Sequence, residues 1–145
     1  MSRIVRKVKT ETDLETIFDI RQKVFVEEQE VAPEEEYDEY EKTSTHFFAM
    51  LDGKPAGTAR WRFTNKGIKL ERFAVLKQAR GKGVGQALVK AVIDDIAATP
   101  EAVDKLLYMH AQLDAVPLYA KFGFQKIGDI FSECDILHYK MERYL

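Results

Sequence analysis

Cysteine and histidine are scarce in this chain of 145 residues, which has one cysteine, Cys134, and three histidines. A single cysteine excludes an internal disulfide bond. One cysteine and three histidines also argue against a structural zinc site, so we expect no bound metal.

Strong net charge and long apolar runs are absent as well. Lys and Arg total 22 against 24 Asp and Glu, which gives a net charge of -2 and no global field that favours nucleic acid. The apolar runs are too short to span a bilayer. Residues 1–6 alternate between polar and apolar and lack the continuous apolar stretch of a signal peptide. We therefore expect a cytoplasmic protein without a nucleic-acid or membrane partner.

The composition is that of an ordinary globular domain, with 46% hydrophobic and 32% charged residues. A chain of this length can build one two-layer core, and no repeat, low-complexity tract or linker divides it. We expect one domain over residues 1–145.

Hydrophobic periodicity predicts seven strands, at residues 3–9, 46–51, 56–63, 68–76, 105–112, 124–131 and 136–143. One amphipathic helix follows a capping box of Thr12 and Glu15, and a second spans residues 83–98. Asp114 is a good N-cap and Gly123 a good C′ residue for a short third helix.

The order of these elements is β-α-β-β-β-α-β-α-β-β. Because a strand–helix–strand passage favours a parallel neighbour, this order predicts an α/β (α+β) fold. We expect a mixed central sheet of six to seven strands, flanked by helices.

Residues 27–42 are strongly acidic, and we expect Pro33 to interrupt any helix there. One interpretation is a solvated loop or short helix. The other is a rim that attracts a cationic acceptor such as an amine.

A glycine-rich turn, Arg80-Gly81-Lys82-Gly83-Val84-Gly85, lies between a predicted strand and a predicted helix. Such a turn can direct several backbone N–H groups toward one anion, and the helix dipole adds positive potential. The pattern lacks the glycine order of a dinucleotide-binding turn and the Gly-Lys-Ser/Thr of a Walker loop. It predicts a ligand with a phosphate or pyrophosphate, the alternative being a merely flexible turn.

This turn, the preceding Arg72-Phe73-Ala74-Val75, and the segment from Ala115 to Phe124 resemble the GNAT superfamily of N-acetyltransferases. The resemblance covers nearly the whole chain and is closest to the ElaA-like (YjcF-like) subgroup. The residues that support the subgroup are Phe25 to Gln29, Glu35-Glu36-x-Asp38, His46, Arg60-Trp61-Arg62, His110-Ala111-Gln112 and Ile136-x-His138-x-x-Met141.

The resemblance implies a β-bulge at Phe73-Ala74-Val75 that splays this strand from the strand at residues 105–112. Backbone groups of Phe73 and Val75 would then pair with the pantetheine of acetyl-CoA, although both side chains also suit plain core packing. The pyrophosphate would bind the amides of Arg80, Gly81, Lys82, Gly83, Val84 and Gly85. Gln112 stands where the family often has a polar residue at the strand end.

The resemblance also places Tyr119 as the general acid that protonates the leaving thiolate, although an aromatic residue packed on a short helix would look the same. Glu71, His110 and His138 are candidates for the base that accepts the amine proton, and His138 also suits a structural role. Nothing in the sequence lowers the pKa of Cys134 visibly, so a covalent acyl-cysteine is not favoured.

The predicted function is transfer of an acetyl group from acetyl-CoA to a primary amine of a small molecule or a protein. Two alternatives stay open, a non-catalytic acyl-CoA sensor and a nucleotide-phosphate enzyme. A homodimer is possible, since dimers are common.

Overall fold

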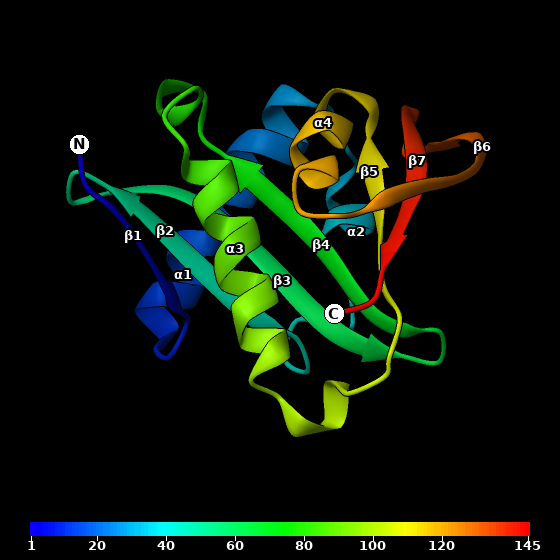
Figure 1. The fold of residues 1–145 in the computed structure, drawn as a ribbon. Helices are drawn as coiled ribbons and strands as arrows, with labels where there is room; N and C mark the ends of the chain where they lie inside the picture. Colours follow the sequence, from blue (N-terminus) through cyan, green and yellow to red (C-terminus); the bar gives the residue numbers. More distant parts are fainter.

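One mixed sheet of seven strands runs through the computed structural model, which describes residues 1–145 (Figure 1). The strand order is β1-β2-β3-β4-β5-β7-β6. The bounds are β1 Arg3–Lys7, β2 Thr45–Leu51, β3 Lys54–Thr64, β4 Gly67–Val75, β5 Leu107–Gln112, β6 Gln125–Glu133 and β7 Ile136–Arg143. Only β4 and β5 pair in parallel. The predicted fold class and element order are confirmed.

Helices cover both faces of the sheet (Figure 1). The longer ones are α1 (Glu11–Arg21), which continues into the π-helical turn η1 (Gln22–Glu28), and α3 (Val84–Ala97). The short ones are α2 (Pro33–Glu36) and α4 (Val116–Ala120), with 3-10 turns at Lys77–Ala79, Pro100–Ala102 and Leu113–Ala115. No helix is both long enough and apolar enough to cross a membrane.

The sheet lies between two apolar clusters, one packed against α3 and the other against α1. On β2, Phe47 belongs to the cluster under α3, whereas its neighbour Phe48 belongs to the cluster under α1. This alternation follows from the period-2 geometry of a strand with both faces buried. The α3 side chain Leu88 and the α1 side chain Ile17 are both fully buried.

Both helix caps differ from the predictions. The N-cap of α1 is Thr10, whose hydroxyl accepts from the amide of Asp13, so the predicted Thr12–Glu15 box is wrong. Arg6 of β1 binds the Asp13 carboxylate at 2.9 and 3.0 Å, which favours a helix start two residues earlier. For α4 the N-cap is Ala115 without a side-chain bond, so Asp114 is not the cap.

Candidate active site

The sheet opens between β4 and β5. These strands pair only at Ile68–Leu107 and Lys69–Tyr108, so β4 has no strand partner on this side from Leu70 to Val75. A bulge accompanies the opening, because Thr58 pairs with Ala74 while Arg60 pairs with Glu71. The extra residue lies at Arg72–Phe73, where Arg72 has φ of 59°, which is earlier on β4 than the predicted Phe73-Ala74-Val75.

The bulge leaves backbone groups of β4 facing the opening. The amide of Leu76 donates to Ala56 on the β3 side at 2.8 Å. Successive residues of a strand direct their backbone groups to opposite sides, so the groups of Val75 face the opening. The Val75 carbonyl accepts from Nε of Arg80 at 3.0 Å. This edge can therefore pair with an extended ligand once the Arg80 side chain moves aside.

The glycine turn lies at the end of this open edge and leads into α3. Gly83 is the N-cap of α3 with φ of 81°, a left-handed conformation that favours glycine. The amides of Gly81, Lys82 and Gly83 donate no hydrogen bond inside the protein. No side chain caps α3 either. The turn therefore presents unpaired N–H groups at the positive end of a 14-residue helix, which is the arrangement that binds phosphate groups.

The charged side chains of the turn differ in how they are held. The guanidinium of Arg80 forms two bonds with the Glu28 carboxylate, at 2.6 and 2.7 Å. Lys82 is exposed, and its carbonyl accepts from Arg3 of β1 at 3.0 Å. The turn thus has positive charge from Lys82 and from Arg3, which the sequence did not indicate because β1 lies 79 residues away.

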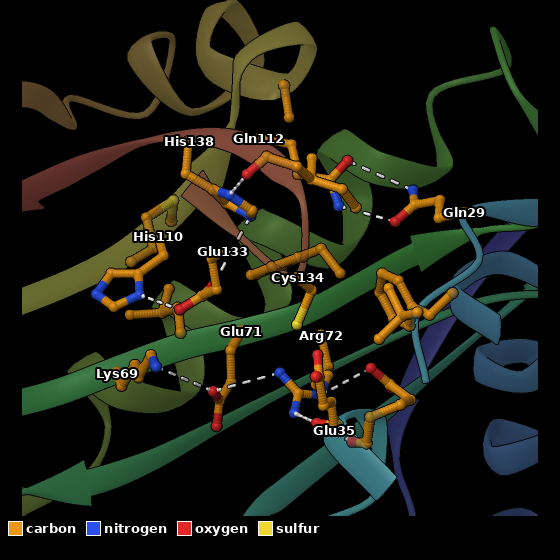
Figure 2. Close-up of a pocket in the computed structure, with 18 of the residues that line it drawn as sticks. Gln29, Glu35, Lys69, Glu71, Arg72, His110, Gln112, Glu133, Cys134 and His138 are labelled. Atoms are coloured by element: carbon orange, nitrogen blue, oxygen red, sulfur yellow. Dashed lines mark hydrogen bonds and ion pairs between the residues drawn. The ribbon is translucent and has the colours of Figure 1, made fainter. Parts of the chain in front are cut away.

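A cavity of about 310 Å³ lies beside the open edge of β4 and is lined by side chains from β4, β5, the β6–β7 hairpin and the segment from η1 to Asp38 (Figure 2). Tyr119 of α4 lines it and packs edge-on against Phe73, with ring centroids 5.5 Å apart. The Tyr119 hydroxyl forms no hydrogen bond inside the protein. No completely buried side-chain nitrogen or oxygen lacks a hydrogen-bond partner, so this hydroxyl must be partly accessible, and it opens to the cavity that Tyr119 lines. Burial raises the pKa of Tyr119, so the hydroxyl stays protonated at neutral pH.

His138 of β7 also lines the cavity, and it is paired with Gln112 of the neighbouring strand β5. Its Nδ1 donates to the Ile136 carbonyl at 2.7 Å, which leaves Nε2 as the lone-pair nitrogen of the neutral ring. Nε2 lies 3.8 Å from the Glu133 carboxylate, which also accepts a bond from Nδ1 of His110 at 3.0 Å. The hydrogen bond from His110 lowers the pKa of Glu133, so this carboxylate is charged and can stabilise a protonated His138.

Glu71, the other candidate base, is held as a charged carboxylate. Its side chain contacts Arg60 and Arg62 at 2.7 Å each and Lys69 at 3.5 Å. Burial alone would raise its pKa, but these cations outweigh burial and lower the pKa to about 2. Such a carboxylate does not accept a proton at neutral pH, so the geometry disfavours Glu71 as the base.

Gln112 and Cys134 have no free reactive role in this geometry. The side-chain amide of Gln112 exchanges hydrogen bonds with that of Gln29, the residue after η1, at 2.9 and 3.4 Å, and so links β5 to the end of η1. Burial and the Glu35 carboxylate raise the pKa of Cys134 to about 11, which opposes a thiolate nucleophile. No group of three or more His, Cys, Asp or Glu side chains is placed to hold a metal ion.

The acidic segment is not a solvated rim throughout. Glu36, Asp38 and Glu41 turn inward and pair with Arg21 and Arg60 at 2.6 to 2.8 Å. The expectation of a solvated segment is therefore wrong for these three residues. Pro33 begins α2 at its first turn instead of interrupting a helix.

An opened parallel strand pair, a turn with unpaired N–H groups at the start of α3 and a tyrosine beside the cavity fit the class of acyltransferase that the sequence resembles. A model of the acetyltransferase (GNAT) domain matches residues 8–145. The chain belongs to the GNAT family of acetyltransferases.

Similar proteins agree with this assignment. The chain is 40% identical over 134 residues to the uncharacterized N-acetyltransferase YjcF of Bacillus subtilis, covering 92% of this chain and 94% of that protein. The structure of Escherichia coli ElaA superposes with a TM-score of 0.86 at 22% identity, covering 98% of this chain and 99% of ElaA. An acyl-CoA N-acyltransferase from Pseudomonas aeruginosa gives 0.81 at 26% identity, with 98% of each chain covered.

These matches confirm the predicted family, its ElaA-like (YjcF-like) subgroup, and the class of acetyl-CoA-dependent N-acetyltransferase.

Proposed function

We propose that the protein transfers an acetyl group from acetyl-CoA to a primary amine by direct attack, with Tyr119 as general acid and His138 as general base. The observation that carries the proposal is the Tyr119 hydroxyl, which is protonated, unpartnered and open to the cavity beside the bulge of β4.

The residues present fit acetyl-CoA. The free amides of Gly81, Lys82 and Gly83 suit its diphosphate, and the open edge at Val75 suits the amides of its pantetheine arm. The amides of Val84 and Gly85 also suit the diphosphate, because they belong to the first turn of α3, where helix amides have no partner within the helix. Bound there, acetyl-CoA would supply the thioester carbon that the amine attacks and the thiolate that leaves.

Two proton transfers accompany the transfer of the acetyl group. As the new C–N bond forms, Nε2 of His138 takes a proton from the attacking nitrogen, and the Glu133 carboxylate at 3.8 Å stabilises the resulting imidazolium. As the C–S bond breaks, the Tyr119 hydroxyl donates a hydrogen bond and then its proton to the sulfur. A proton then passes through solvent from the His138 imidazolium to the Tyr119 phenolate, which restores both groups, and the products are the N-acetylated amine and free CoA.

A matched pair of tyrosine variants tests the proposal. Tyr119→Phe removes only the hydroxyl, and Tyr144→Phe is the control because Tyr144 lies exposed near the C-terminus. General acid catalysis contributes about 10² to 10⁴-fold, so we expect kcat for thiol release to fall by that factor in Tyr119→Phe and to stay unchanged in Tyr144→Phe. Full activity of Tyr119→Phe with every amine would exclude the acid role.

A sensor without turnover gives a different result in the same assay. Acetyl-CoA would raise the thermal midpoint of the wild-type protein, since a ligand that binds only the folded state stabilises it. No amine would then support thiol release above the background rate. That combination would replace the catalytic proposal with the binding alternative.

A further inference from the structure

Carboxylates outnumber cations among the side chains that line the cavity. The lining carboxylates are Glu35, Glu36, Asp38, Glu71 and Glu133, and the lining cations are Arg62, Lys69 and Arg72. Behind this lining lie two further cations, Arg21 and Arg60, and one further carboxylate, Glu41. With these included and the histidines neutral, six carboxylates face five cations, so the cavity has an excess of one negative charge.

Three of the lining carboxylates are compensated inside the protein. Glu36, Asp38 and Glu71 each lie within ion-pair distance of at least two cations. The shortest of these contacts is 2.7 Å for Glu36, 2.6 Å for Asp38 and 2.7 Å for Glu71. The excess negative charge therefore does not lie at these three side chains.

Glu133, at the end of β6, is compensated only in part. Its carboxylate contacts the rings of His110 and His138, at 3.0 and 3.8 Å, and no Lys or Arg side chain within ion-pair distance. Lys69 also lowers the pKa of Glu133, but from beyond ion-pair distance, and Lys69 is shared with Glu71 at 3.5 Å. Glu133 can therefore attract a further cation.

Glu35, on α2, has no cation paired with its carboxylate. Arg72 donates to the backbone carbonyl of Glu35 at 3.5 Å, but its ion pairs go to other carboxylates. The Glu35 carboxylate lies beside the thiol of Cys134, which directly follows Glu133 in the β6–β7 hairpin, and raises its pKa. Figure 2 shows Cys134 between Glu133 and Glu35. These two carboxylates, Glu35 and Glu133, form the acidic pair that carries the excess charge.

Two buried side chains of the same cavity have a polar atom without a hydrogen-bond partner. Tyr119 is 7% exposed and His138 is 6% exposed, and both line the cavity. The Tyr119 hydroxyl forms no hydrogen bond inside the protein, and of the two ring nitrogens of His138 only Nδ1 forms one. Because a buried polar group without a partner costs free energy, both atoms indicate that a polar ligand binds beside them.

The remaining wall of the cavity is apolar. Phe25, Val31 and Ile136 contribute to its lining together with Phe73 of β4. A methylene chain that packs against these side chains removes apolar area from water on both sides of the contact. The cavity therefore suits a ligand with an aliphatic middle and nitrogen at its ends.

We propose that the acyl acceptor is an aliphatic diamine or polyamine, whose reacting nitrogen is directed toward His138 and Tyr119 while a second, protonated nitrogen binds the acidic pair. One ammonium group matches an excess of one negative charge. A cavity of about 310 Å³ is large enough for a short aliphatic diamine. The inference rests on the proposed acetyl transfer and names the class of its acceptor.

Acceptors matched in chain length test this inference without any mutation. One set is 1,4-diaminobutane, 1-aminopentane and 5-aminopentanoate, and another is 1,5-diaminopentane, 1-aminohexane and 6-aminohexanoate. Within a set, the distal ammonium is replaced by a methyl or a carboxylate group.

The acidic pair is partly in water, since Glu35 is exposed and the Glu133 side chain is 44% exposed, so its attraction is screened. We therefore expect kcat/KM for the preferred diamine to be about tenfold higher than for its methyl analogue, and the carboxylate analogue to be the poorest. Equal or better turnover of the methyl or carboxylate analogues would overturn the inference and leave the acetyl transfer intact.

Variants of α2 then locate the preference. Glu35→Gln should remove most of it through a higher KM for the diamine, with the KM of the methyl analogue unchanged. Glu35→Lys should reverse it, so that the carboxylate analogue becomes better than the diamine. Glu34→Gln is the control, because Glu34 is the preceding exposed glutamate of α2 and does not line the cavity. A diamine preference that survives in both Glu35 variants overturns the assignment of the ammonium site.

A binding measurement separates the two proposals. N-acetyl-1,4-diaminobutane and N-pentylacetamide, its methyl analogue, are titrated into the CoA-saturated protein and followed by NMR. Tighter binding of the first compound that is lost in Glu35→Gln supports the ammonium site even where no amine is acetylated, in which case only the proposed catalysis fails. Equal affinity for the two compounds overturns the inference, as does an absence of binding together with an absence of diamine turnover.

Discussion

Replacing Glu71 by glutamine should lower the free energy of unfolding without removing a catalytic group. The pKa of Glu71 is about 2 in the folded protein against 4.5 for the free side chain, a difference of 2.5 units. At 1.36 kcal/mol per unit, the charged carboxylate contributes about 3 kcal/mol to stability near pH 7. Because the pKa is lower in the folded state, this contribution is present above about pH 4.5 and is lost as the pH falls toward 2.

Urea unfolding at pH 7 and at pH 3 measures this contribution. We expect Glu71→Gln to lower the free energy of unfolding by about 3 kcal/mol at pH 7 and by clearly less at pH 3, where the wild-type protein has lost part of the same stabilisation. The thiol-release activity of the folded variant should stay within about tenfold of wild type, since general-base loss costs 10² or more. Unchanged stability with a hundredfold lower kcat would refute the structural role and restore Glu71 as the base.

Three further substitutions test the binding turn and the cysteine. Gly83→Ala forces a side chain into φ of 81°, so we expect about 1–2 kcal/mol lower stability in thermal unfolding and a higher KM for acetyl-CoA; an unchanged KM would count against the turn. Arg3→Ala removes the bond to the Lys82 carbonyl, so a severalfold weaker binding of acetyl-CoA is expected by calorimetry, and equal affinity would show that Arg3 plays no part. Cys134→Ser should leave kcat unchanged, because the thiol has its pKa raised to about 11, and an inactive variant would contradict this.

Much of the fold could be predicted from local patterns. All seven strands follow from alternating or continuous apolar runs, and the bounds of β7 agree to the residue. The first residues of the helices are predicted less accurately from the sequence. Thr10 and Thr12 are each followed three residues later by an acidic residue, so the local pattern alone does not separate them. The ion pair between Arg6 and Asp13, which forms only when β1 and α1 meet, selects the first.

The inward ion pairs of the acidic segment could not be predicted for the same physical reason. Arg60 and Asp38 are 22 residues apart and pair only after the segment around α2 folds over the sheet. Without that contact, a run of acidic residues is typical of a solvated segment. The glycine turn and Tyr119 were found because the pattern of each is local in sequence, and the resemblance supplied a role for both.

The binding of acetyl-CoA by the turn before α3 is tested most directly by NMR of the backbone amides. Saturating acetyl-CoA should shift the amides of Gly81, Lys82 and Gly83 together with that of Val75, whereas acetyl-pantetheine, which lacks the diphosphate, should shift Val75 alone. If acetyl-CoA binds and the amides of the turn do not move, the diphosphate lies elsewhere and the account of the site is wrong.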